Sequence, residues 1–228
     1  EDFLKLLAKH CFSNIKFNFS QPNSNPTNDI VQALQPQFMT SIFKNKTEAF
    51  TKLLGITEGK ANFFYKDNLG IATAYGWNPT KNSKEFNVDV AHKIGMSNSQ
   101  IKSIEQISNN SKVQSVPQSL KKVVLTDRQI QKSAEIMLSF YESELLDVLK
   151  IKSQENNKDY SKALKAYHSL PNNQQVVMVH MAFKVGKKNL LKYNQFFNGL
   201  FNYMDKPTAK NLERVTANIN YSFKTRNG

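Results

Sequence analysis

The sequence predicts an α+β fold that is mostly α-helical, with one small β-hairpin among the helices. Apolar residues recur at helical spacing over long stretches, as from Ile130 to Val148. The segment Gln174–Val185 is apolar almost all round, which is typical of a helix buried on every side. Between these patterns and the N-terminus, Phe63–Tyr65 and Ile71–Tyr75 favour two short strands, and the turn between them is rich in Asp, Asn and Gly.

Length and composition are those of a folded domain. A chain of 228 residues can bury one core, or one core with a modest appendage. Its 16 Phe and 39% apolar content argue against a disordered chain. No stretch approaches the roughly 18 apolar residues of a membrane span, so none is predicted. With one cysteine, Cys11, and four histidines without metal-type spacing, neither a metal nor another cofactor is expected.

The balance of charge favours a polyanionic partner. Lys and Arg total 31 against 18 acidic residues, a net charge of +13. Nucleic acid, an anionic membrane face and an anionic cell-wall polymer would each fit this charge. The basic residues are spread along the chain, so no nucleic-acid arm stands out. An equally good explanation is that much of this charge is ordinary solvated surface.

A linker divides the chain near its start. Residues Ser20–Asp29 contain two prolines and three asparagines and no apolar side chain. We therefore expect an N-terminal appendage with its linker over residues 1–29, and the main domain over 30–228. The chain begins with Glu rather than Met, which favours a fragment or a processed product. The appendage could dock on the domain or join a larger assembly.

Helix signals follow in order along the main domain. A helix is expected from Ile30 to Leu54, with Gly55 as its stop. Thr126-Asp127-Arg128-Gln129 fits a capping box, which predicts the start of a long helix that runs to about Ile151. Shorter helices are expected over 97–107, around 164–167, over 190–201 and from 207 to 215.

Two carboxylates and a threonine accompany the predicted hairpin. Glu58 follows the first main helix, Asp67 lies in the turn, and Thr73 lies on the second strand. The hairpin would hold Asp67 and Thr73 near each other, with Glu58 beside them from its own helix. This is a candidate two-carboxylate hydrolytic site. Taken singly, each residue also has an ordinary explanation: a turn aspartate, a strand threonine and a solvated helix-end acid.

The spacing of these residues resembles that of the phage-type lysozymes, the muramidase family of phage endolysins and tail lysozymes. Glu58, Asp67 and Thr73 fall within the pattern E-G-x(5)-Y-K-D-x-x-G-x-x-T. Farther along, Val179–Gly186 resembles the family's buried helix with its Met-x-Phe-x-x-Gly ending, and Leu190–Phe197 resembles the aromatic helix that follows it. The resemblance extends over about residues 40–215.

The resemblance implies a lysozyme-like two-lobed fold, with a small hairpin lobe and a helical lobe around the buried helix. It also implies a bacteriolytic enzyme of the cell envelope or periplasm, which cleaves the β-1,4 bond between N-acetylmuramic acid and N-acetylglucosamine in peptidoglycan with inversion. Glu58 would be the general acid, because partial burial favours a protonated carboxyl group. Asp67 would be ionised and, with Thr73, would position and activate the attacking water.

The resemblance adds substrate contacts and shows one departure. Phe183 and Asn211 fall where the family's cleft-lining residues lie, and Arg226 falls near the position of a family arginine. Trp77, beside the hairpin, could stack on a sugar ring or pack in the core. The family follows its threonine with a Gly-Tyr-Gly-His run, whereas this chain has Ala74–Asn78 there.

Two alternative functions stay open at the level of sequence. The first is a non-catalytic cell-wall-binding or structural module of a phage tail or secretion apparatus, which has kept the lysozyme fold and joins its assembly through the N-terminal segment. The second is a basic nucleic-acid-binding domain, for which net charge is the single argument. Peptidoglycan is the preferred partner, and nucleic acid is not expected.

Overall fold

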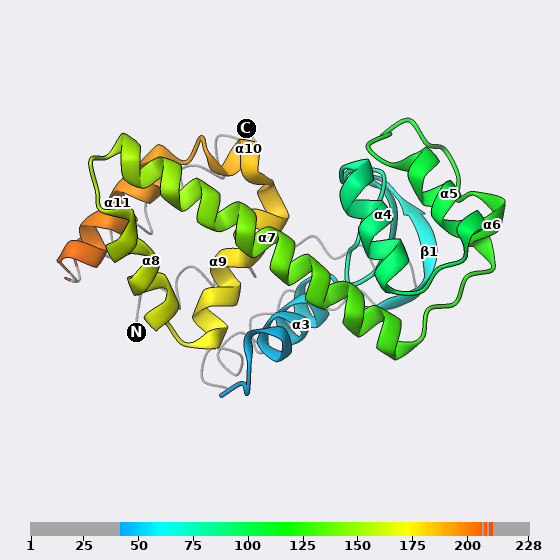
Figure 1. Ribbon diagram of the computed structural model, residues 1–228, viewed down its shortest axis with the longest axis horizontal. Coiled ribbons are helices and arrows are strands. Elements are labelled where there is room, and N and C mark those ends of the chain that lie inside the picture. The colour runs from blue at the N-terminus through cyan, green and yellow to red at the C-terminus, as the bar shows by residue number, and fades with distance from the viewer. Residues whose placement is uncertain (1–41, 207, 209, 212–228) are drawn as a thin grey trace. The chain divides into compact units, whose positions relative to one another are not determined.

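The computed structural model describes residues 42–206, 208, 210 and 211. Over these residues the chain is mostly helical, with a single two-stranded antiparallel sheet, so the predicted α+β, mostly α class is confirmed (Figure 1). None of the helices described is long and apolar enough to cross a membrane. The predicted appendage over residues 1–29, Cys11 and Arg226 lie outside the described residues.

The described chain divides into two compact units. The first, here called the helical unit, consists of residues 42–53 and the chain from residue 138 onward. The second, the hairpin unit, consists of residues 54–137. The divisions fall inside two helices, α3 (Lys46–Thr57) and α7 (Asp127–Glu155), so each of these helices contributes to both units.

The sheet of the hairpin unit is a tight hairpin. Strand β1 (Ala61–Asp67) pairs with β2 (Gly70–Ala74), and Asp67 lies opposite Gly70, which leaves a two-residue turn. The register shifts between Ala61 and Tyr65, so β1 bulges there. The strands are therefore where the sequence predicted them, but β1 is longer at both ends because its outer residues also find partners on β2.

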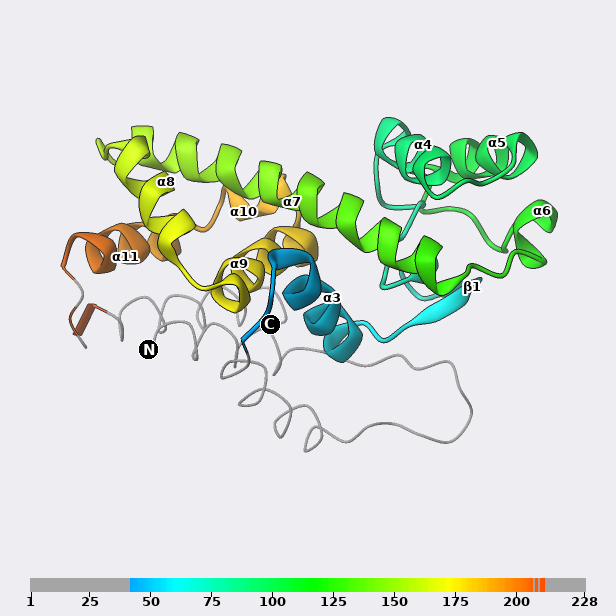
Figure 2. The same ribbon diagram turned by 60° about the horizontal axis from the view of Figure 1, so that its bottom comes forward.

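Helices with well-formed caps cover the rest of the hairpin unit. Ser97 and Gln100 form a capping box at the start of α5, and Thr126 and Gln129 form the predicted one before α7. Helices α4 and α5 lie side by side (Figure 2). A single turn of helix, α6, follows Pro117. The bounds are α4 Lys84–Lys93, α5 Asn98–Ile107 and α6 Gln118–Lys121.

A buried helix, α9 (Asn172–Val185), lies at the centre of the helical unit. Most of its residues are buried, as its nearly continuous apolar sequence predicted. Gly186, with φ of +73°, follows its last residue. Helices α8 and α11 lie beside each other in the same unit (Figure 1). The remaining helices of this unit are α8 Tyr160–Ser169, α10 Lys187–Leu190 and α11 Asn194–Asp205.

The predicted stop at Gly55 is wrong. Helix α3 continues through Gly55, and the glycine with a left-handed backbone is Gly59, with φ of +73°. Glycine in a helix costs only about 1 kcal/mol, so it ends a helix only where its backbone leaves helical angles. As a result Glu58 comes directly after the last helical turn, and its N–H still donates to the carbonyl of Leu54 at 2.7 Å.

Candidate active site

The three residues predicted to carry the chemistry all belong to the hairpin unit. Glu58 follows the end of α3 and is partly buried, with its Oε1 atom fully buried. Asp67 is the last residue of β1 and is partly exposed. Thr73 lies in β2 and is 0% exposed. One helix end and one hairpin therefore supply all three side chains.

The phenol of Tyr65 is affected by the charges of both carboxylates. This residue lies in β1 two residues before Asp67. Burial raises the pKa of the Tyr65 phenol, and the negative charges of Asp67 and then Glu58 raise that pKa further. Both carboxylates therefore oppose ionisation of this phenol. The sequence analysis missed this role, although Tyr65 stands inside the pattern that carries the family resemblance.

The turn of the hairpin holds the carboxylate of Asp67. Its Oδ1 atom accepts the backbone N–H of Leu69 at 2.7 Å, which is the local bond that makes aspartate common in turns. The Nζ of Lys66 donates to the backbone carbonyl of Asp67 at 2.7 Å. Backbone and side chain of Asp67 are thus both tied to their neighbours in sequence, and this restricts the directions in which the carboxylate can point.

Thr73 presents a hydroxyl that the described part of the chain does not satisfy. Its Oγ1 atom is buried and has no hydrogen-bond partner there. Its backbone N–H donates to the carbonyl of Trp77 at 3.0 Å, away from β1. A buried polar group without a partner costs about 1–3 kcal/mol, so such groups call for an explanation. A water or a ligand group held at this site would supply the partner.

Residues Ala74–Asn78, where the sequence differs from the phage-lysozyme pattern, begin with a turn that contains two left-handed residues. Ala74 has φ of +54° and Gly76 has φ of +81°, and Thr73 and Trp77 form an isolated bridge across them. Alanine in this region costs roughly 1–2 kcal/mol relative to a right-handed backbone. These residues therefore form a tight turn directly beside Thr73, at some cost in backbone strain.

A buried hydroxyl holds the start of β2 against the loop that follows. Oγ1 of Thr80 accepts the N–H of Ile71 at 3.1 Å and donates to Oδ1 of Asn78 at 2.6 Å. Gly70 lies against the same hydroxyl, because a Cβ built there would stand 1.8 Å from it. This close approach requires glycine at position 70. Asn78, the last residue of Ala74–Asn78, thus helps to hold the hairpin through its hydrogen bond with Thr80.

The prediction of Trp77 as a sugar-stacking residue is wrong. The ring is 0% exposed, so its face is not available to a ligand. It packs edge-on against Phe64 with 6.0 Å between the ring centroids, and its Nε1–H donates to Oδ1 of Asn87 at 2.9 Å. Trp77 is a core residue, which was the other explanation that its sequence position allowed.

The other two predicted substrate contacts, Phe183 and Asn211, belong to the helical unit. Phe183 is partly exposed on α9, and its ring lies edge-on to Tyr141 at 5.3 Å between centroids. The Asn211 amide donates to the carbonyl of Lys206 at 2.9 Å, just beyond α11. Glu58, Asp67 and Thr73 thus come from one helix end and one hairpin of the same unit, and their joint role stays a prediction, as do the roles of Phe183 and Asn211.

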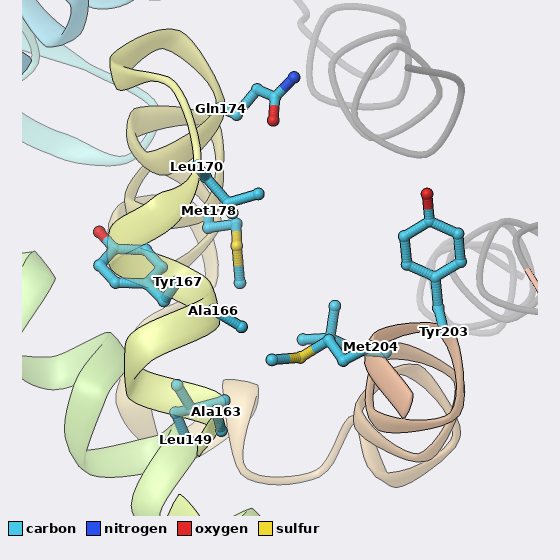
Figure 3. A pocket seen from close by; sticks show the side chains of 10 residues that line it. Leu149, Ala163, Ala166, Tyr167, Leu170, Gln174, Met178, Tyr203 and Met204 are labelled. Atoms are coloured by element: carbon cyan, nitrogen blue, oxygen red, sulfur yellow. The ribbon is translucent and has the colours of Figure 1, made fainter. Parts of the chain in front are cut away.

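The helical unit has an apolar cavity of about 220 Å³. Met178 of α9 and Met204 of α11 point toward one another across it, while the Tyr167 hydroxyl points away (Figure 3). That hydroxyl donates to Oε1 of Glu142 at 2.7 Å. Among the described residues of the lining there is no carboxylate, histidine, lysine or cysteine, and the two tyrosines are the titratable side chains there. The cavity is lined by Leu149, Ala163, Ala166, Tyr167, Leu170, Gln174, Met178, Leu200, Tyr203 and Met204.

Comparisons with protein-family models, with curated proteins and with solved structures give no match. Among the residues that the structure covers, no group of three or more His, Cys, Asp or Glu could hold a metal ion. The chemistry of the site is therefore inferred from its own side chains and from their spacing in the sequence.

Proposed function

We propose that this chain is a peptidoglycan hydrolase, a muramidase of the phage-lysozyme type that cleaves the β-1,4 bond between N-acetylmuramic acid and N-acetylglucosamine. The observation that carries the proposal is that a helix-end glutamate with a buried Oε1 atom is followed by a hairpin that carries Asp67 and the buried, unpartnered hydroxyl of Thr73. Glycosidic cleavage requires two carboxyl groups near one substrate bond. The hairpin that follows the glutamate-bearing helix, and the buried α9, agree with a lysozyme-like two-lobed fold.

The two carboxyl groups would take different roles. Glu58, with one oxygen buried, is the general acid and gives its proton to the leaving glycosidic oxygen as the bond to the anomeric carbon breaks. Asp67, partly exposed in its turn, takes a proton from the water that attacks the same carbon from the opposite face. The hydroxyl of Thr73 holds that water. Attack from the opposite face inverts the anomeric configuration.

The charge of the chain agrees with the proposed substrate. A net charge of +13 favours association with an anionic bacterial wall, and long-range attraction of this kind raises the rate of encounter. The protein would then act in the bacterial cell envelope. Such attraction also predicts that binding to cell walls weakens as salt is added, because salt screens exposed charges.

The proposal is tested by digesting purified peptidoglycan and determining the masses of the products. Products with N-acetylmuramic acid at the reducing end are expected, and N-acetylglucosamine at that end would instead indicate a glucosaminidase. The strained Ala74 turn beside Thr73 favours one alternative, a non-catalytic wall-binding or structural module of a phage tail or secretion apparatus. Binding to peptidoglycan without any product would support that module.

Replacing Thr73 with Val is expected to separate activity from stability. Valine keeps the β-branched shape and removes the buried hydroxyl that lacks a partner. The free energy of unfolding should stay the same or rise by about 1–3 kcal/mol, because an unsatisfied buried group is removed. The rate of product release should fall by about tenfold, because one hydrogen bond to the attacking water is lost.

Thermal unfolding and product release of the Thr73→Val protein check this prediction together. A Thr73→Ser variant is the matched control, because it keeps the hydroxyl and should retain most of the activity. A Thr73→Val protein with full activity would show that the hydroxyl has no part in the reaction. A protein that loses both activity and stability would show that Thr73 is a structural residue.

A further inference from the structure

The outward side of β1 carries apolar surface that the proposed chemistry does not use. Phe63 is 43% exposed and Val124 is 69% exposed. These two residues form a backbone bridge, so their side chains are neighbours. Single exposed apolar residues need no explanation, but neighbouring ones that include an aromatic ring often mark a binding surface.

This surface is continuous with the candidate active site. The rings of Phe63 and Tyr65 meet edge to face, with 6.1 Å between their centroids. Phe64, between them, is 5% exposed and packs on Trp77, so it points to the opposite side of the strand. Phe63 and Tyr65 therefore share one side of β1. Tyr65 lies two residues before Asp67 on the same strand, so the aromatic surface continues toward that carboxylate.

The direction and size of the surface favour an extended chain of sugars over a protein partner. Phe63, Tyr65 and Asp67 follow one another at alternate positions along β1, and the four steps from Phe63 to Asp67 span at most about 13 Å. A stable protein interface needs roughly 800 Å² from each partner, far more than one ring and one valine provide. A sugar ring, in contrast, offers a flat apolar face of the size of one aromatic side chain.

We propose that Phe63, with Tyr65 and Val124, forms a subsite that stacks against a sugar ring of the glycan strand, at a position beyond the bond that is cleaved. The inference rests on the proposed function, because it takes the glycan to be the substrate of Glu58 and Asp67. It assigns the glycan a course along β1, and it gives the exposed ring of Phe63 the stacking role that buried Trp77 cannot fill.

The test separates stacking from general apolarity with two substitutions at one position. Phe63→Trp keeps an aromatic face, whereas Phe63→Leu keeps an apolar side chain and removes the ring. Each variant is made in the wild-type chain for kinetics and in a Glu58→Gln chain for sedimentation with insoluble peptidoglycan. Ile42→Ala is the control, because Ile42 is 99% exposed and belongs to the helical unit. The melting temperature of every variant is measured.

Phe63→Leu is expected to weaken binding to insoluble peptidoglycan, measured by sedimentation, about three- to tenfold. It should also raise KM more than it lowers kcat and leave the melting temperature unchanged. Phe63→Trp and Ile42→Ala should bind as the parent does. If the Phe63→Leu protein binds peptidoglycan as tightly as the protein with Phe63, the subsite proposal is wrong, even if the wild-type protein digests peptidoglycan. If the wild-type protein releases no product and Phe63→Leu still weakens binding, Phe63 contacts the glycan in a non-catalytic module, and the hydrolase proposal falls. If the parent neither binds nor digests, both fall.

Discussion

Replacing Glu58 with Gln is expected to abolish the release of products from peptidoglycan, with a loss in kcat of roughly 10²–10⁴-fold. Glutamine has nearly the same size and can still make hydrogen bonds, but it has no acidic proton to give to the leaving oxygen. Folding should not suffer. Because Oε1 of Glu58 is buried, a neutral amide of nearly the same size fits in its place, and stability should stay the same or rise.

Clearing of a cell-wall suspension, product analysis and thermal unfolding together measure the effect of Glu58→Gln. The matched control is Glu85→Gln, because Glu85 is an exposed acid in the first turn of α4 in the same unit. That control also replaces one carboxyl group with an amide, and it should leave activity unchanged. Full activity of the Glu58→Gln protein would end the hydrolase hypothesis. Loss of activity together with a large fall in melting temperature would indicate a structural role instead.

Replacing Gly70 with Ala is expected to lower the free energy of unfolding by roughly 2–5 kcal/mol. The φ of Gly70 is +139°, a region that side-chain-bearing residues rarely adopt. The new Cβ would also stand 1.8 Å from Oγ1 of Thr80. That hydroxyl cannot retreat without losing its bonds to Ile71 and Asn78. Backbone strain and a steric clash therefore add together at this position.

Urea denaturation of the Gly70→Ala protein checks this prediction, and Gly95→Ala is its matched control. Gly95 also has a left-handed backbone, with φ of +76°, but a Cβ built there meets nothing within 4 Å. The control should therefore lose only about 1–2 kcal/mol, from backbone strain alone. The difference between the two variants measures the clash with Thr80. Equal losses in both would show that the hairpin moves away from that loop without cost.

Local chemistry explains which features the sequence determined by itself. The capping box at Thr126, the row of buried isoleucines in α5 and the apolar run that ends before Gly186 each depend on residues within a few positions of one another. The hairpin and the spacing of Glu58, Asp67 and Thr73 are local in the same sense. Periodicity, caps and turn residues act over such short distances, and a sequence displays them directly.

Tertiary structure alone decided which side chains are buried and what they touch. Trp77 was open to two explanations until Phe64 and Asn87 were found to enclose it. Gly55 stays helical, whereas Gly70 must remain glycine because Thr80, ten residues away, occupies the space of a side chain. The raised pKa of Tyr65 depends on its burial and on the charges around it, and the proposed stacking role of Phe63 depends on its exposure. Burial and electrostatics depend on neighbours that only the folded chain assembles, so no pattern of adjacent residues could have shown them.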